Sequence, residues 1–203
     1  MTRGNLMKLY YSGNSPYARR ARIAVREGGL TDQVEEIAID SFEDLKDHGP
    51  GGKIPVLVTD SGDSLCESLI ITRYLDELSG GKLLPVDPVE KMKCLVLEST
   101  ASVLMDSMFV RSMENNQREE ELKSATLLKR EFDRCHRCYD ALNKLVVETD
   151  DTVTLGSIAV ISALGYANWR HPEDDWRNNR AALAAYYDQL MARKVFEETA
   201  PVF

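Results

Sequence analysis

The sequence predicts a two-part α/β protein, with a small mixed sheet and its helices over residues 1–84 and helices alone over residues 89–203. Two observations support this division. Up to about residue 84, strand-like and helix-like patterns alternate, whereas beyond it the apolar residues recur only at helical spacing. Between the two parts, residues 83–88 contain two prolines, which is typical of a linker. A strand–helix–strand unit followed by a hairpin and a helix can form one sheet with helices packed against it.

The N-terminal part contains the signals of strands and of two helices. The strands are expected at residues 7–11, 34–39, 56–58 and 64–66. The sequence DSGD separates the last two strands and predicts an antiparallel hairpin. The first helix is expected at residues 16–27, where two glycines follow, and the second at residues 67–78, which the sequence SGG closes.

The C-terminal part shows only helical periodicity. Helices are expected at residues 89–113, 119–147, 155–168 and 180–191, with a short final turn at residues 195–198. The first two are long, and the second has a charged outer face. A chain of 203 residues can bury roughly 70% of the surface that its unfolded form exposes, so it needs no metal or disulfide to hold a core.

The composition argues against several classes of protein. The chain has 33 acidic and 25 basic residues, which gives a net charge of −8. Nucleic acid and anionic membrane surfaces are therefore not expected as partners, because phosphate groups bind clustered lysine and arginine. No run of about 20 apolar residues could span a bilayer, and the N-terminus lacks the apolar core of a signal peptide. The four cysteines have no disulfide-framework spacing, so we expect free thiols in a cytoplasmic protein.

Several segments resemble one known family. Residues 53–75 (KIPVLVTDSGDSLCESLIITRYL) resemble the glutathione-binding core of the glutathione S-transferases, most closely the bacterial and tau-like pattern. Residues 11–25 (YSGNSPYARRARIAV) resemble the first strand, the serine-type catalytic turn and the first helix of that family. Residues 154–170 and 192–196 resemble its buried core helix and its C-terminal ending. The resemblance covers nearly the whole chain, and its specificity lies in the combined order of the motifs.

The resemblance implies a thioredoxin-like domain over residues 1–84 that binds glutathione, and an all-helical domain over residues 89–203 that shapes the electrophile site. It implies conjugation of the glutathione thiolate to an apolar electrophile, a detoxification reaction, in a homodimer that needs no metal. Two alternatives fit the same motifs. One is another glutathione-dependent enzyme, such as an isomerase, dehalogenase or peroxidase, and the other is a binding protein without catalysis. The sequence does not separate them, because the second-substrate pocket is the divergent part of the family.

Candidates for holding glutathione are Lys53, Ile54, Pro55, Glu67 and Ser68. In the family the Ile-Pro bond is cis and presents the preceding residue's backbone to the cysteinyl part of glutathione, which is strand addition by a tripeptide. Ser68 begins a helix whose unpaired N–H groups attract the γ-glutamyl carboxylate, and Glu67 accepts from the γ-glutamyl ammonium group. Lys53 resembles the lysine that meets the glycyl carboxylate. Without the family, Ser68 or Glu67 is a helix cap and Lys53 a solvated charge.

A transferase must favour the thiolate, because a thiol with a pKa near 8.5 is mostly protonated at neutral pH. Ser15 is the candidate donor to the sulfur, since it precedes Pro16 at an expected helix start and resembles the serine of tau-like enzymes. Omega-like enzymes have cysteine there, so serine argues against disulfide exchange. Ser15 as an ordinary N-cap is the alternative reading. Ser12, Asn14 and Tyr11 are competitors for the same role.

Met108, Arg111 and Trp169 are candidates for the second-substrate pocket, because in the family the middle of the first long helix faces the glutathione sulfur. At helical spacing, however, methionine and aromatic residues are more often core. Cys135 and Cys138 form a CxxC inside an expected helix, without a second pair of ligands, and do not predict a zinc or redox site.

Two further expectations concern helix starts and surface charges. The family's core helix usually begins with Ser or Thr followed three residues later by Asp, but here Ser157 follows Thr154. We expect the missing acid to weaken this helix start, although Thr154 can still cap it. Arg19 and Arg20 are expected to be exposed and to have no specific role.

Overall fold

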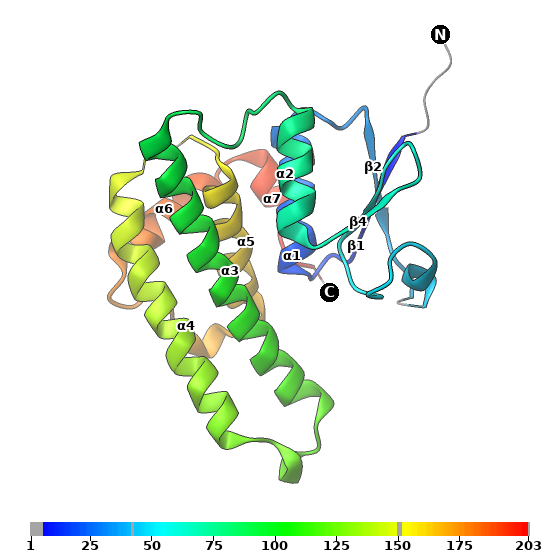
Figure 1. The fold of residues 1–203 in the computed structure, drawn as a ribbon. Helices are drawn as coiled ribbons and strands as arrows, with labels where there is room; N and C mark the ends of the chain where they lie inside the picture. Colours follow the sequence, from blue (N-terminus) through cyan, green and yellow to red (C-terminus); the bar gives the residue numbers. More distant parts are fainter. Residues whose placement is uncertain (1–5, 42, 150–151, 203) are drawn as a thin grey trace.

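A computed structural model describes residues 6–41, 43–149 and 152–202. Its N-terminal part is a four-stranded sheet in the order β2-β1-β3-β4 (Figure 1). The strands are β1 (Met7–Tyr11), β2 (Val34–Ala38), β3 (Val56–Val58) and β4 (Ser64–Cys66). β1 and β2 are parallel, whereas β3 is antiparallel to both β1 and β4. The predicted mixed sheet and its hairpin are therefore confirmed.

Two helices lie between this sheet and the rest of the molecule (Figure 1). They are α1 (Pro16–Glu27), which connects the two parallel strands, and α2 (Ser68–Leu78), which follows β4. The alternation within β1 sets which face they cover, because Met7 and Leu9 are buried while Lys8 between them is exposed. The other feature of this part is a short 3₁₀ helix, η1 (Asp44–Asp47), in a segment without a predicted element.

The C-terminal part is helical, as predicted. Its helices are α3 (Pro88–Gln117), α4 (Ala125–Leu145), α5 (Leu155–Arg170), α6 (Ala181–Met191) and α7 (Lys194–Glu198), with short 3₁₀ helices η2 (Glu120–Leu122), η3 (Val146–Glu148) and η4 (Pro172–Asp174). α3 packs along both α4 and α5. The residues of α5 are buried along almost its whole length, so this helix is the core of the region. Within the described ranges, no helix is long and apolar enough to cross a membrane.

The predicted helix at residues 119–147 is interrupted. η2 is separate, and α4 begins only at Ala125, where the Ser124 hydroxyl accepts from the N–H of Leu127 at 3.2 Å. The Ser124 N–H donates to the carboxylate of Glu114 on α3 at 2.7 Å. The buried carboxylate of Glu114 on the neighbouring helix thus fixes the turn before α4. The charge pattern of the sequence did not predict this interruption of the helix.

The start of α5 is capped by a pair of hydroxyl groups. The Ser157 hydroxyl accepts from the Thr154 N–H at 2.7 Å, and the Thr154 hydroxyl accepts from the Ser157 N–H at 3.2 Å. Serine therefore replaces the acid of the family pattern in a complete capping box. The Ser157 hydroxyl thus accepts the backbone hydrogen bond that the missing acid would accept, and the lower stability of this helix start stays a prediction.

Arginines of α1 join the two parts of the chain. Arg19 is only 2% exposed, and its guanidinium donates to the carbonyls of Ile161 at 3.1 Å and Phe196 at 2.8 Å. Arg20 is also buried and donates to the Ser102 hydroxyl at 2.8 Å. The expectation that these arginines are exposed was wrong, because α5 and the C-terminal segment cover Arg19 and α3 covers Arg20.

Candidate functional site

Three segments meet at one edge of the sheet. Val56, the first residue of β3, is paired with Tyr10 near the end of β1 and with Cys66 at the end of β4. Because β3 is antiparallel to both neighbours, the chain after β1, before β3 and after β4 lies at the same edge. These segments are residues 12–15, 53–55 and 67–68. The structure thus brings the candidate thiol-activating turn and the candidate glutathione residues together.

The segment before β3 presents an unpaired backbone. The peptide bond between Ile54 and Pro55 is cis, as predicted. Among the described residues, the N–H and C=O of Ile54 have no hydrogen-bond partner. Both groups can therefore pair with the backbone of a bound peptide. Lys53 beside them is exposed and has no ion pair with any residue that the structure describes.

The segment after β4 presents an uncapped helix end. Glu67 has a backbone φ of 70°, which is uncommon for a residue with a side chain. It occupies the N-cap position of α2, yet its side chain accepts no capping hydrogen bond. The N-cap side chain caps each of α1, α3, α4 and α5, whereas α6 and α7, like α2, have no such cap. The first N–H groups of α2, beginning at the buried Ser68, are therefore available to an anion such as a carboxylate.

In the turn after β1, the two serine hydroxyls differ in whether their protons are committed. The Ser15 Oγ accepts from the Ala18 N–H at 3.2 Å, which caps α1 but leaves the Ser15 proton without an acceptor among the described residues. Ser12 instead donates to the Asn14 Oδ1 at 2.9 Å. Tyr11 lies with its ring 4.1 Å from the Arg22 guanidinium. The Ser12 proton is thus committed and the Ser15 proton is not, while the Tyr11 hydroxyl and the Asn14 amide also have no acceptor among the described residues.

Tyr17 connects this turn to α3. Its hydroxyl donates to the Asp106 Oδ1 at 2.6 Å, and its ring meets Phe109 edge-on with centroids 6.1 Å apart. Burial, with the hydrogen bond to Asp106, raises the pKa of Tyr17 above its ordinary value. Asp106 and Phe109 are exposed. Their i, i+3 spacing was the one signal in the sequence that they share a helix face.

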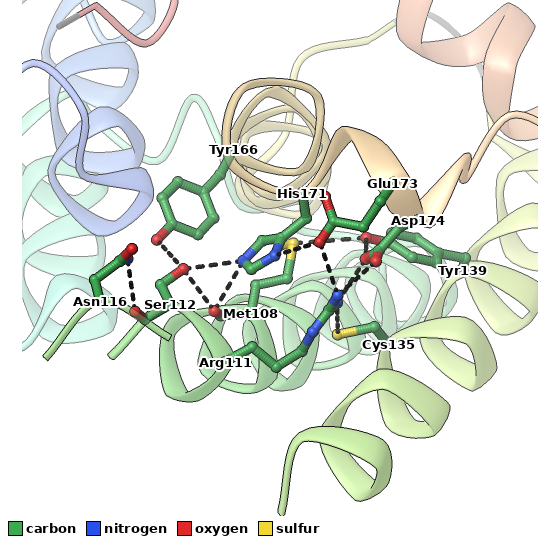
Figure 2. Close-up of polar contacts among 10 residues, drawn as sticks. All are labelled: Met108, Arg111, Ser112, Asn116, Cys135, Tyr139, Tyr166, His171, Glu173 and Asp174. Atoms are coloured by element: carbon green, nitrogen blue, oxygen red, sulfur yellow. Dashed lines mark hydrogen bonds and ion pairs between the residues drawn. The ribbon is translucent and has the colours of Figure 1, made fainter. Parts of the chain in front are cut away.

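Met108 and Arg111 lie on a different, buried side of α3 (Figure 2). The Arg111 guanidinium donates to both carboxylate oxygens of Asp174 at 2.7 Å and lies 3.6 Å from the Cys135 Sγ. Met108 is fully buried. The expectation that these two side chains line a pocket for a second substrate is thus corrected, because a buried guanidinium requires a carboxylate partner and α3 turns both residues inward. Trp169 lies half-buried at the end of α5.

A serine, a histidine and a glutamate in this region resemble a catalytic triad but do not have its chemistry. The Ser112 Oγ lies 2.9 Å from the His171 Nε2, and Glu173 lies 3.5 Å from Nδ1 (Figure 2). The same Nε2 is 3.0 Å from the Met108 carbonyl oxygen, which can only accept, so Nε2 carries a proton. Burial lowers the pKa of His171 and keeps the ring neutral. His171 therefore positions helices instead of activating Ser112.

The CxxC pair is also inert. Cys135 and Cys138 are buried in α4, and burial raises the pKa of the Cys135 thiol to about 12. Since the thiolate is the reactive form, burial disfavours redox chemistry at this pair. Across residues 6–41, 43–149 and 152–202, no group of three or more His, Cys, Asp or Glu side chains could hold a metal ion.

A cavity of about 410 Å³ lies between the start of α3 and the end of α4. Its lining is mostly apolar and consists of Pro88, Val89, Met92, Lys93, Val96, Leu97, Leu145, Glu148 and Thr149. Met92 and Asp106 are roughly 20 Å apart along the axis of α3, at a rise of about 1.5 Å per residue. The cavity is therefore separate from the edge where the three segments meet.

The sequence and fold match those of known proteins. Residues 14–78 match the family model of the glutathione S-transferase N-terminal domain. The chain is 32% identical over 200 residues to the uncharacterized GST-like protein YibF of Escherichia coli K12, an alignment that covers 96% of this chain and 98% of the relative. The chain belongs to the glutathione S-transferase family.

Solved structures of the same family have the same fold along their whole length. A glutathione S-transferase from Methylobacillus flagellatus KT, with glutathione bound, has a TM-score of 0.89 at 31% identity, over 97% of this chain and 100% of that one. A family member from Pseudomonas fluorescens Pf-5, also with glutathione bound, has a TM-score of 0.91 at 29% identity over the same shares. The predicted glutathione transferase fold, with a thioredoxin-like first part, is therefore confirmed.

Proposed function

We propose that this glutathione S-transferase family member conjugates the thiolate of glutathione to an apolar electrophile. Residues 1–84 act as the glutathione-binding domain, and residues 89–203 act as the domain that contributes the electrophile site. The observation that carries this proposal is the Ser15 hydroxyl, which caps α1 through its oxygen and keeps its proton uncommitted. It lies at the sheet edge that also includes residues 53–55 and 67–68.

Each part of glutathione has a proposed partner at this edge. The unpaired N–H and C=O of Ile54, which precedes Pro55, pair with the cysteinyl backbone. The uncapped start of α2 and the Ser68 hydroxyl bind the γ-glutamyl carboxylate, while Glu67 accepts from the ammonium group. Lys53 binds the glycyl carboxylate. The glutathione bound in the Methylobacillus and Pseudomonas structures supports glutathione as the ligand.

Ser15 is proposed to stabilise the thiolate. Lowering a thiol pKa by about 2 units requires roughly 2.7 kcal/mol of preferential stabilisation of the anion. A charge-assisted hydrogen bond from the Ser15 O–H, together with the positive end of α1, is of the right size. Once formed, the thiolate attacks an electrophile held beside it, and no metal is required for that step.

An ultraviolet titration of bound glutathione across pH tests this role, with Ser15→Ala compared to Ser124→Ala. Ser124 is a matched control, because its hydroxyl caps α4 at the same 3.2 Å distance. Each substitution is expected to cost about 1 kcal/mol of stability through the lost cap. Only Ser15→Ala is expected to shift the thiol pKa back towards 8.5.

Two other outcomes of this titration have distinct meanings. An unchanged thiolate signal in Ser15→Ala would assign the donor to Ser12, Asn14 or Tyr11. Glutathione that binds to the unmodified protein only as the neutral thiol would contradict the transferase and favour a binding protein. If the thiolate forms but no electrophile reacts, assays with peroxides, maleyl compounds and halides would test the peroxidase, isomerase and dehalogenase alternatives.

We also propose a cytoplasmic homodimer. The exposed apolar side chains on α2 and the first half of α3 support an association, and they include Leu69, Ile70, Val89 and Met92. The cysteines, all free, are consistent with a reducing compartment. Sedimentation equilibrium at micromolar concentration measures the assembly, and a monomer under those conditions would contradict the dimer.

A further inference from the structure

Asp106 has an acceptor that the protein itself does not use. Its Oδ1 accepts from the Tyr17 hydroxyl at 2.6 Å, and its Oδ2 has no partner among the described residues. The side chain is exposed on α3. Arg20, whose charge interacts with that of Asp106, is buried and donates to Ser102, and it forms no hydrogen bond or ion pair with this carboxylate. Asp106 therefore presents a negative charge with free lone pairs to a bound molecule.

Tyr17 reinforces the same preference. Because the pKa of Tyr17 is raised, its phenol stays protonated, and its proton remains on the side of Asp106. What Tyr17 still offers outward is the lone pairs of its oxygen, which accept hydrogen bonds. The two side chains together thus present acceptors and no free donor.

The position of this pair links it to the proposed chemistry. Tyr17 is the second residue of α1 and follows Ser15, the proposed thiolate donor, by two positions. Phe109 lies one turn beyond Asp106 on α3 and contacts the Tyr17 ring edge-on. Asp106 and Phe109 of α3 therefore contact the first turn of α1, the helix that Ser15 caps.

We propose, on the basis of the function proposed above, that Asp106 determines specificity for the electrophile. The favoured class has an aromatic body that packs on Tyr17 and Phe109 and an ammonium or other N–H group that donates to the Asp106 Oδ2. Electrophiles with a carboxylate in the same position are disfavoured, because two like charges in this place repel each other and no donor compensates.

Equilibrium binding of three prepared glutathione conjugates tests this specificity without requiring turnover. The conjugates carry S-(4-aminomethylbenzyl), S-(4-methylbenzyl) and S-(4-carboxybenzyl) groups, and isothermal titration calorimetry gives each affinity. For the unmodified protein, we expect the ammonium conjugate to bind roughly fivefold more tightly than the carboxylate conjugate, which is the upper range for a solvent-exposed charge pair.

Asp106→Asn keeps an acceptor for Tyr17 and removes the charge, so its ratio of affinities is expected to fall to about one. Glu121→Gln is the matched control, because Glu121 is also exposed and lacks an ion pair among the described residues. This substitution changes the net charge by the same amount as Asp106→Asn. Its ratio is expected to equal that of the unmodified protein, at matched ionic strength.

The outcomes separate this inference from the proposed function. Binding of the neutral conjugate and conjugation of an uncharged electrophile would support the proposed function. If, in addition, Asp106→Asn keeps the charge preference, or the unmodified protein has no such preference, only the specificity role of Asp106 is overturned. If no conjugate binds and no thiolate forms, the proposed function fails and the role of Asp106 fails with it.

Discussion

Replacing Arg111 by leucine is expected to lower the free energy of unfolding by about 4 kcal/mol. The guanidinium donates to both Asp174 oxygens at 2.7 Å, and the Asp174 side chain is 0% exposed. Leucine would leave this carboxylate buried with the Tyr139 hydroxyl, at 3.0 Å, as its remaining partner. Breaking such a buried pair typically costs about 3–5 kcal/mol. For a protein of this size, the melting temperature is expected to fall by about 12 °C.

Thermal unfolding of Arg111→Leu beside Arg177→Leu isolates the effect of burial. Arg177 makes the same two-pronged contact with Asp188, at 2.7 and 3.1 Å, but both side chains are at least 40% exposed. Its loss is expected to cost about 1 kcal/mol. The double variant Arg111→Leu/Asp174→Asn, which removes the buried charge and keeps an acceptor for Tyr139, should recover at least half of the deficit. Equal losses in the two single variants would refute this reasoning.

Three further substitutions test how buried polar groups hold the fold. Gly165→Ala would place a methyl group against the Arg19 guanidinium, which its carbonyl acceptors hold in place, and is expected to lower stability by about 1–3 kcal/mol in denaturant unfolding; no change would mean that Arg19 moves freely. Ser157→Ala removes the hydrogen bond from the Thr154 N–H and is expected to cost about 1 kcal/mol, so an unchanged melting temperature would contradict the capping box. Burial lowers the pKa of His171 in the folded protein, whereas in the unfolded chain the pKa of this histidine is about 6.5. Below pH 6.5 the unfolded chain therefore binds more protons than the folded protein. The stability that the neutral His171 contributes above this pH is lost as the pH falls towards the folded-state pKa. In His171→Gln this part of the decline in stability between pH 7.5 and 5.5 should disappear, and an identical pH slope would count against it.

The candidate site was predictable where it depends on local sequence. Pro16 after Ser15 marked a helix start, and the hairpin between two short strands placed Glu67 and Ser68 beside Pro55. These features depend on backbone conformations that a few adjacent residues dictate. The family resemblance already favoured Ser15 over Ser12, and the structure adds which of the two hydroxyl protons is already committed.

The middle of α3 was not predictable in the same way. Met108 and Arg111 lie within five residues of Asp106 and Phe109, and all four fit a helix equally well. Which of them face outward depends on where α4, α5 and α1 pack around α3. The hydrophobic pattern of so long a helix is not one-sided, because different neighbours cover different faces along its length.

The mixed sheet, the hairpin, the cis bond before Pro55 and the change to helices near residue 85 could all be predicted from the sequence, because each follows from periodicity or from the family motifs. Which charges are buried depends instead on long-range packing. Arg19 bonds to the carbonyl of Phe196, 177 residues away, and Arg111 to Asp174, 63 residues away. No local pattern contains such pairs, because the free energy of a buried charge depends on the partner that folding brings to it.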